Sequence, residues 1–181
     1  MKHKFIAPLF AVSALWSSHS LALEGQELET TGDILQWAIP ATAGVISLAK
    51  FDGEGFGQLV EGAFLTASAT HILKVAINAE RPNGGDYSMP SGHTSAAMQG
   101  AAYLQFRYGW KYGVPAYLAA GVVGYSRVDR NYHYWRDVAA GTLLATAIQY
   151  SVTKAGFSVT NFAVAPTFDG ERVGILANIK F

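Results

Sequence analysis

The chain has 181 residues, a length that suits one domain with one hydrophobic core. Half of the residues are hydrophobic and only 14% are charged, and the mean hydropathy of +0.18 lies between soluble domains and multipass membrane proteins. Thirteen basic residues balance thirteen acidic ones, so no basic field indicates nucleic-acid binding. The absence of cysteine excludes disulfides, thiolate catalysis and a cysteine-type zinc site.

The first 22 residues predict a secretory signal peptide. Residues 2–4 are basic, residues 5–16 are apolar, and Ser20 and Ala22 fit the small-x-small cleavage pattern. We therefore expect export to a bacterial periplasm or cell envelope, and we exclude this segment from the fold. An uncleaved N-terminal anchor is the alternative.

Residues 23–156 predict a mainly α domain, a compact bundle of about five core helices. The expected helices cover residues 34–50, 57–79, 92–106, 114–125 and 136–154. The acidic segment before them is expected to be extended, and Pro40 is expected to kink or split the first helix. None of these segments contains the eighteen clean apolar residues expected of a spanning helix. The second helix, which carries charged side chains, is therefore either a buried core helix or a membrane helix with its polar residues facing inward.

The tail, residues 157–181, changes character. Residues 157–167 and 171–181 alternate in polarity around Asp169 and Gly170, a strong turn signal. This pattern predicts a C-terminal β-hairpin, which we expect to pack on the helical domain.

Lys74 and Arg81 are seven residues apart. If the second helix continues that far, the spacing is two turns and places both cations on one face. Two like charges at the end of an apolar helix need an anion to offset them. The alternative is a pair of long side chains that reach into solvent from an ordinary helix end.

Pro90-Ser91-Gly92-His93 places a turn directly before the third helix. The backbone N–H groups at such a helix start are unpaired and carry the positive end of the helix dipole, so they suit phosphate. Gly92 lets an anion approach the backbone closely, and His93 in the first turn can reach the same anion. An ordinary serine-capped helix with a surface histidine is the alternative.

His133 and Asp137 are four residues apart, adjacent on one helical face if the fifth helix begins before His133. A carboxylate bonded to one imidazole nitrogen fixes the tautomer and leaves the other nitrogen free to attack. Arg127, six residues upstream of His133, adds a planar fork for phosphate oxygens. Alone, this run also fits a structural histidine beside a helix-start aspartate.

Taken together, the three runs supply fixed cations, two histidines, one carboxylate and a glycine turn. Lys74-x6-Arg81-Pro82, Pro90-Ser91-Gly92-His93 and Ser126-Arg127-x5-His133-x3-Asp137 resemble the three-part signature of the superfamily of type-2 phosphatidic-acid phosphatases, vanadium haloperoxidases and bacterial class A acid phosphatases. A histidine–aspartate metal site is the chemical rival, but lysine and arginine in the same site would repel a divalent cation.

The resemblance implies a role for each signature residue. His133 would be the nucleophile that forms a phosphohistidine, Asp137 would orient it, and His93 would be the general acid and then the base for water. The phosphoryl oxygens would be held by Lys74, Arg81, Ser91, Gly92 and Arg127. No metal or other cofactor would be required, and vanadate would act as a phosphate mimic and inhibitor.

Three functions remain open on this basis. The first is a metal-independent phosphatase acting on phosphate mono- or diphosphate esters, either lipids such as phosphatidate, phosphatidylglycerol phosphate or undecaprenyl diphosphate, or small soluble phosphates. The second is a vanadium-dependent haloperoxidase, and the third is a non-catalytic binder of phosphate or lipid headgroups. The two histidines and the aspartate argue against the third, because binding alone needs only the cations. The expected partner is a phosphate-ester substrate, with membrane association left open and nucleic acid excluded.

Overall fold

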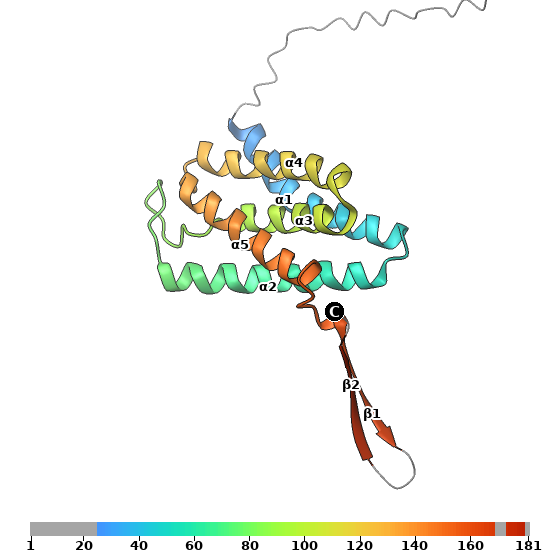
Figure 1. Cartoon of the computed structure of the whole chain (residues 1–181). Coiled ribbons are helices and arrows are strands. Elements are labelled where there is room, and N and C mark those ends of the chain that lie inside the picture. The colour runs from blue at the N-terminus through green and yellow to red at the C-terminus, as the bar shows by residue number, and fades with distance from the viewer. Residues whose placement is uncertain (1–24, 169–172, 180–181) are drawn as a thin grey trace, which may run out of the picture.

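The computed structural model of the chain describes residues 25–168 and 173–179, so the predicted signal peptide lies outside the described residues. Five long helices make up the body (Figure 1). They are α1 (Gly25–Ala49), α2 (Gly53–Ile77), α3 (Gly92–Tyr108), α4 (Trp110–Asp129) and α5 (Trp135–Thr153). This confirms the predicted mainly α fold with five core helices.

The third helix, α3, lies at the centre and contacts each of the other four helices. Its middle is built from small residues, and Ala97, Ala101 and Ala102 are completely buried there. Small side chains let neighbouring helix backbones approach closely. At Gly100, for example, an added Cβ would lie 2.8 Å from the Cα of Pro40 in α1. The glycine therefore allows α1 to pack closely against α3 at this point.

The first helix differs from the prediction at its start and at Pro40. It begins at Gly25 and not near residue 34, and Pro40 lies inside one continuous helix. The early turns are stabilised by contacts that the local sequence does not reveal, because Glu29 accepts hydrogen bonds from Arg130 and Tyr132 near the end of α4. Pro40 costs the helix one backbone hydrogen bond but packs directly on α3.

Two further boundaries change how the signature residues are arranged. Helix α2 ends at Ile77 with Asn78 in the left-handed conformation, so Arg81 lies in the following loop and not two helical turns beyond Lys74. The fourth helix runs on to Asp129, so Arg127 is in its last turn and not in a loop.

The chain order brings the signature runs to one end of the bundle. In Figure 1, the consecutive helices from α2 to α5 run in alternating directions. One end of the bundle therefore holds the end of α2, the start of α3, the end of α4 and the start of α5. Three sequence runs that are far apart along the chain are thereby placed side by side.

Helix α2 is, among the described residues, the one helix long and apolar enough to cross a membrane by length and composition. Core helices of soluble proteins share this property. The helix alone therefore does not distinguish a membrane protein from a soluble one.

After α5 the chain makes a short 3-10 turn (Val159–Asn161) and two strands, β1 (Phe162–Phe168) and β2 (Val173–Ile179). The strands are paired antiparallel, with Phe162 opposite Ile179. In Figure 1 they extend away from the helices. The predicted hairpin that packs on the helical domain is therefore not supported, and the five helices alone define the fold class.

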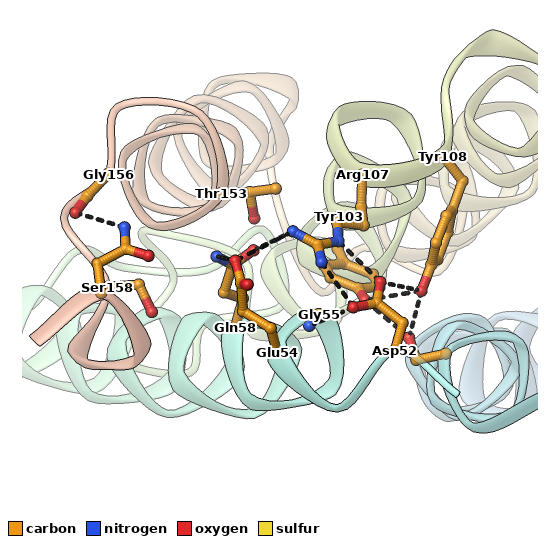
Figure 2. A network of polar contacts seen from close by, with 12 residues as sticks. Asp52, Glu54, Gly55, Gln58, Tyr103, Arg107, Tyr108, Thr153, Gly156 and Ser158 are labelled. Carbon is orange, nitrogen blue, oxygen red and sulfur yellow. Dashed lines mark hydrogen bonds and ion pairs between the residues drawn. The ribbon is translucent and has the colours of Figure 1, made fainter. Parts of the chain in front are cut away.

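At the other end of the bundle, a polar network joins α2 to α3 (Figure 2). Asp52, directly before α2, receives two hydrogen bonds from Arg107, at 2.6 and 2.8 Å, and one from the Tyr108 hydroxyl at 2.9 Å. Its Oδ1 also accepts the Gly55 N–H at 2.9 Å, which caps the helix. The Arg107 hydrogen bonds, helped by Gly55 and Tyr108, outweigh burial and lower the pKa of Asp52 to about 2.

Asp52→Asn should lower the free energy of unfolding by about 2 kcal/mol, because one amide oxygen cannot replace two charged acceptors. Chemical denaturation of both proteins measures the difference. Because the pKa of Asp52 in the folded protein lies below its ordinary value of 3.8, its contribution to stability is present above that pH and is lost as the pH falls towards 2. Glu54→Gln is the matched control: Glu54 is 45% exposed and 3.4 Å from Arg107, so a change under about 0.5 kcal/mol is expected. Equal losses in the two variants would contradict the assignment.

Candidate active site

A pocket of about 300 Å³ opens at the end of the bundle where the signature runs meet. Six of its lining residues come from these runs, namely Lys74, Arg81, Gly92, His93, Arg127 and His133. Helix α1 adds Glu29 and Asp33, and the loop after α4 adds Tyr132. Two imidazoles and three cationic side chains therefore share one small cavity.

His133 lies in the turn before α5 and is 3% exposed. The N–H of His133 donates to the carbonyl of Arg127 at 3.2 Å, which positions the turn against the end of α4. The condition under which His133 and Asp137 would share a helical face is not met, because α5 begins only at Trp135. The two side chains are nevertheless neighbours, with Nδ1 of His133 3.7 Å from Oδ2 of Asp137.

Ser88 lies beside this imidazole and this carboxylate and contacts both. Its hydroxyl donates to Oδ2 of Asp137 at 2.5 Å and lies 3.4 Å from Nδ1 of His133. The same Oδ2 accepts the Tyr134 N–H at 2.9 Å, and Asp137 is completely buried. The imidazole nitrogen Nδ1 thus faces a fixed polar group, which leaves Nε2 as the ring nitrogen available to the pocket.

Burial, with Lys74 and Arg81 close by, lowers the pKa of His133 to about 4, although Asp137 opposes the shift. The imidazole is therefore neutral at neutral and mildly acidic pH. A neutral imidazole has a free lone pair on one nitrogen, which is the form that a nucleophile requires.

His93 lies in the first turn of α3 and lines the same pocket as His133. Its Nε2 donates to Oδ1 of Asp33 on α1 at 3.1 Å. The same oxygen accepts a hydrogen bond from Nη1 of Arg127 at 2.8 Å. Burial and then Arg127 lower the pKa of His93, with Arg81 acting in the same direction and Asp33 opposing them.

Lys74 and Arg81 are held by the loop that joins α2 to α3. Nζ of Lys74 donates to the carbonyl of Tyr87 at 2.6 Å, and Nε of Arg81 donates to the carbonyl of Asp86 at 2.9 Å. Burial, and then Arg81, lower the pKa of Lys74 to about 8. The loop therefore fixes both cations at the pocket without neutralising them with a carboxylate.

Arg127 is 3% exposed and is tied to α1. Besides Asp33, it donates to the carbonyl of Glu29 at 2.9 Å, and its guanidinium lies over the Tyr132 ring, 5.5 Å from the ring centroid. These contacts hold the planar group in one orientation at the pocket wall.

Gly92 lines the pocket, but Ser91 does not. Ser91 is completely buried, its N–H donates to the carbonyl of Asp137 at 3.0 Å, and its hydroxyl accepts a hydrogen bond from Thr94 at 3.0 Å. It therefore joins the start of α3 to the start of α5, and its predicted contact with phosphate stays a prediction.

Two site residues have no signal in the sequence pattern. Asp33 lies inside α1, in a stretch that nothing in the sequence connects with the site, and it lines the pocket. Ser88 is an unremarkable loop residue until folding places it beside His133. Their neighbours Glu29 and Tyr132 line the pocket and bond to each other at 2.7 Å.

In the part of the chain that the structure describes, no group of three or more His, Cys, Asp or Glu side chains is placed to hold a metal ion. The basic side chains at the pocket suit an oxyanion better than a cation. Independence from metals stays a prediction.

Residues 55–160 match the family model of the PAP2 superfamily. The lipid A 4'-phosphatase of Helicobacter pylori (strain J99) is 32% identical over 138 residues, which are 70% of this chain and 69% of that protein. The lipid A 1-phosphatase of Helicobacter pylori is 36% identical over 75 residues, covering 36% of this chain and 40% of that protein.

Two more distant likenesses agree with these. Lipid phosphate phosphatase 1 of Arabidopsis thaliana is 36% identical over 80 residues, covering 35% of this chain and 24% of that protein. The crystal structure of Aquifex aeolicus LpxE superimposes with a TM-score of 0.65 at 20% identity, over 74% of this chain and 87% of that one. At this identity the structural likeness shows a shared fold.

Proposed function

This chain belongs to the PAP2 superfamily and is a phosphoric ester hydrolase, and we propose that it removes phosphate from a phosphorylated lipid through a phosphohistidine intermediate. The names of its relatives support a lipid substrate, and the match over residues 55–160 includes all three signature runs. The resemblance seen in the sequence is thereby confirmed at the level of the superfamily.

One observation supports this reaction above others: a single pocket is lined by two imidazoles and three fixed cations. Lys74, Arg81 and Arg127 suit the negatively charged phosphoryl oxygens and the charge that develops in the transition state. Gly92 at the start of α3 adds a backbone N–H at the positive end of the helix dipole.

The first chemical step would be attack by His133. Its Nε2 lone pair forms a bond to phosphorus while the ester P–O bond breaks, and the leaving oxygen takes a proton from the protonated imidazole of His93. The Nδ1–H of His133 faces Ser88 and Asp137, which stabilise the positive charge that the ring acquires. The products of this step are the free alcohol and phosphorylated His133.

The second step would release phosphate. His93, now neutral, takes a proton from water as the water oxygen attacks phosphorus and the P–N bond to His133 breaks. Inorganic phosphate leaves, and both histidines return to their starting protonation states. No step consumes a cofactor.

Release of phosphate from phosphatidate and from p-nitrophenyl phosphate, assayed with a metal chelator present, tests the function. We expect turnover of both esters and inhibition by vanadate, which mimics the phosphoryl group at the cations. Absence of turnover with every phosphate ester, by protein whose helical content is intact, would refute the proposal.

The two histidines predict an acidic pH optimum. His133 must be neutral and His93 must be protonated, so kcat/KM should rise as pH passes about 4 and fall as pH passes the lowered pKa of His93, below 6.5. His93 is faced by Asp33 from α1, Arg127 from α4 and Arg81 from the loop, and Asp33 alone among these raises its pKa. Asp33→Asn should therefore move the descending limb to lower pH.

The pH dependence of kcat/KM for p-nitrophenyl phosphate measures this shift. Glu29→Gln removes a carboxylate from the same pocket wall that does not bond to His93, so it should leave the descending limb in place. A descending limb that is unmoved in Asp33→Asn would exclude this carboxylate as a partner of the general acid.

We also propose that the enzyme acts in the cell envelope. The predicted leader, residues 1–22, supports export, and the names of the relatives support an envelope lipid as substrate. Fractionation of cells after a carbonate wash separates an integral enzyme from a peripheral or soluble one.

A further inference from the structure

Three separate segments of the chain meet at the buried hydroxyl of Ser88. Ser88 lies in the loop between α2 and α3, His133 in the turn between α4 and α5, and Asp137 in the first turn of α5. Ser88 and Asp137 are completely buried, and His133 is 3% exposed. Of the three, only His133 lines the pocket, so any effect of Ser88 on the reaction passes through a neighbour.

The backbone of the loop holds Ser88 in place. Its N–H donates to the carbonyl of Ala79 at 2.8 Å, and its carbonyl accepts a hydrogen bond from Nζ of Lys74 at 3.4 Å. Neither contact involves the side chain. Removing the hydroxyl should therefore leave the loop and Lys74 where they are.

Counting protons shows which way the side-chain contacts of Ser88 run. A hydroxyl has one proton to donate, and its oxygen can accept as well. Ser88 donates its proton to Oδ2 of Asp137 at 2.5 Å, an oxygen that also accepts the Tyr134 N–H. In its contact with Nδ1 of His133, at 3.4 Å, the Ser88 oxygen can then only accept. The proton of the neutral imidazole is thereby placed on Nδ1, and the lone pair on Nε2.

Asp137 lies farther from the imidazole than Ser88 does. Its Oδ2 is 3.7 Å from Nδ1 of His133, which is beyond the distance of a hydrogen bond. A carboxylate at that distance attracts a positive ring but gives the N–H no preferred direction. The resemblance assigned the orientation of His133 to Asp137, whereas in the structure the Ser88 hydroxyl is the nearer of the two groups.

We propose that Ser88 is the positioning residue of the nucleophile, and that Asp137 acts on His133 through the Ser88 hydroxyl. This inference rests on the proposed function and adds a residue that lies outside the three signature runs. As the bond from Nε2 to phosphorus forms and the ester P–O bond breaks, the proton on Nδ1 stays on the ring. The ring becomes positive, its N–H bond to Ser88 shortens, and Asp137 keeps its negative charge.

Ser88→Ala should lower kcat/KM by about 10- to 100-fold, because a hydrogen bond to a group that becomes charged is lost. The loss should be the same for p-nitrophenyl phosphate and for a lipid phosphate, since one nucleophile attacks both. The inhibition constant of inorganic phosphate should change less than about twofold, because Ser88 does not line the pocket.

Ser95→Ala is the matched control. Ser95 is 2% exposed, and its hydroxyl donates to the carbonyl of Ser91 at 2.9 Å, so this variant also loses one buried hydrogen bond near the start of α3. Chemical denaturation should show a similar loss of stability in the two variants, while Ser95→Ala keeps kcat/KM within about threefold. Equal losses of activity in both variants would reduce Ser88 to a structural role.

Nitrogen NMR of protein with isotope-labelled histidine tests the proton position without turnover. The shifts of the two ring nitrogens distinguish a protonated from an unprotonated one, and comparison with His133→Ala assigns the signals. At neutral pH, His133 should carry its proton on Nδ1 in the wild type and in Ser95→Ala. It should move towards the Nε2–H form in Ser88→Ala. A wild-type ring protonated on Nε2 would overturn the proposal, whether or not the variants fold.

The double variant Ser88→Ala with Asp137→Asn tests the order of the groups. Its loss of kcat/KM should be smaller than the product of the two single losses, because both changes interrupt one path. Losses that multiply would show that Asp137 acts independently of Ser88. If phosphate is trapped on His133 while Ser88→Ala keeps wild-type kcat/KM, the proposed function stands and the role of Ser88 is refuted.

Discussion

His133→Ala should lower phosphate release from every substrate by at least about 10³-fold, because the alanine has no lone pair to attack phosphorus. The wild-type enzyme, mixed with substrate and quenched in alkali, should carry phosphate on His133 alone. Phosphohistidine withstands alkali and decomposes in acid, so mass spectrometry of alkali-quenched peptides locates the group. The variant should show no phosphorylated peptide.

Because His133 is buried, the variant must be shown to fold. Its thermal unfolding midpoint should rise when inorganic phosphate is added, since Lys74, Arg81 and Arg127 remain to hold the anion. A folded His133→Ala enzyme with wild-type turnover would exclude the phosphohistidine pathway. Phosphate trapped on any other residue would reassign the nucleophile.

His93→Ala should separate substrates by their leaving groups. Hydrolysis of a lipid phosphate should fall by about 10²- to 10⁴-fold, because an alkoxide leaves poorly without a proton. The first step with p-nitrophenyl phosphate should be much less affected, since p-nitrophenolate is a stable anion that needs no general acid. The side chain of His93 is about one-third exposed, and Arg127 and Asp33 still pair without it, so the fold should tolerate the change.

The same variant should slow the second step, because His93 is also the proposed base for water. With p-nitrophenyl phosphate, a rapid burst of one p-nitrophenol per active site should then precede a slow steady rate, and phosphorylated His133 should accumulate. Stopped-flow absorbance measures the burst. Equal losses with both classes of substrate and no burst would assign His93 to binding and not to proton transfer.

The helical body could be predicted because its signals are local. The turn before Gly92 and the apolar runs of α2 and α5 depend on residues close together in sequence, and the predicted and observed helices overlap throughout. The start of α1 could not be predicted, because its polar first turns are stabilised by Arg130 and Tyr132, about a hundred residues away. The polar sequence of this segment predicted an extended chain, whereas in the structure it forms the first turns of α1.

The candidate site shows the same division. The types and spacing of Lys74, His93 and His133 predicted a phosphate pocket, and these side chains do line one cavity. The helical geometry considered for two of the runs does not occur, because α2 ends before Arg81 and α5 begins after His133. Arg81 is instead positioned at the pocket by backbone contacts of the loop, such as its hydrogen bond to the carbonyl of Asp86.

By itself, the sequence determined which chemical groups are present and in which order, and that inventory was enough to indicate the superfamily. Only the tertiary structure decided which of those groups meet, because contacts such as Asp33 with His93 and Ser88 with Asp137 join residues 49 or more positions apart. Their geometry depends on how five helices pack around α3. Burial within that packing also sets the protonation state of His133, since removing an imidazole from water disfavours its charged form.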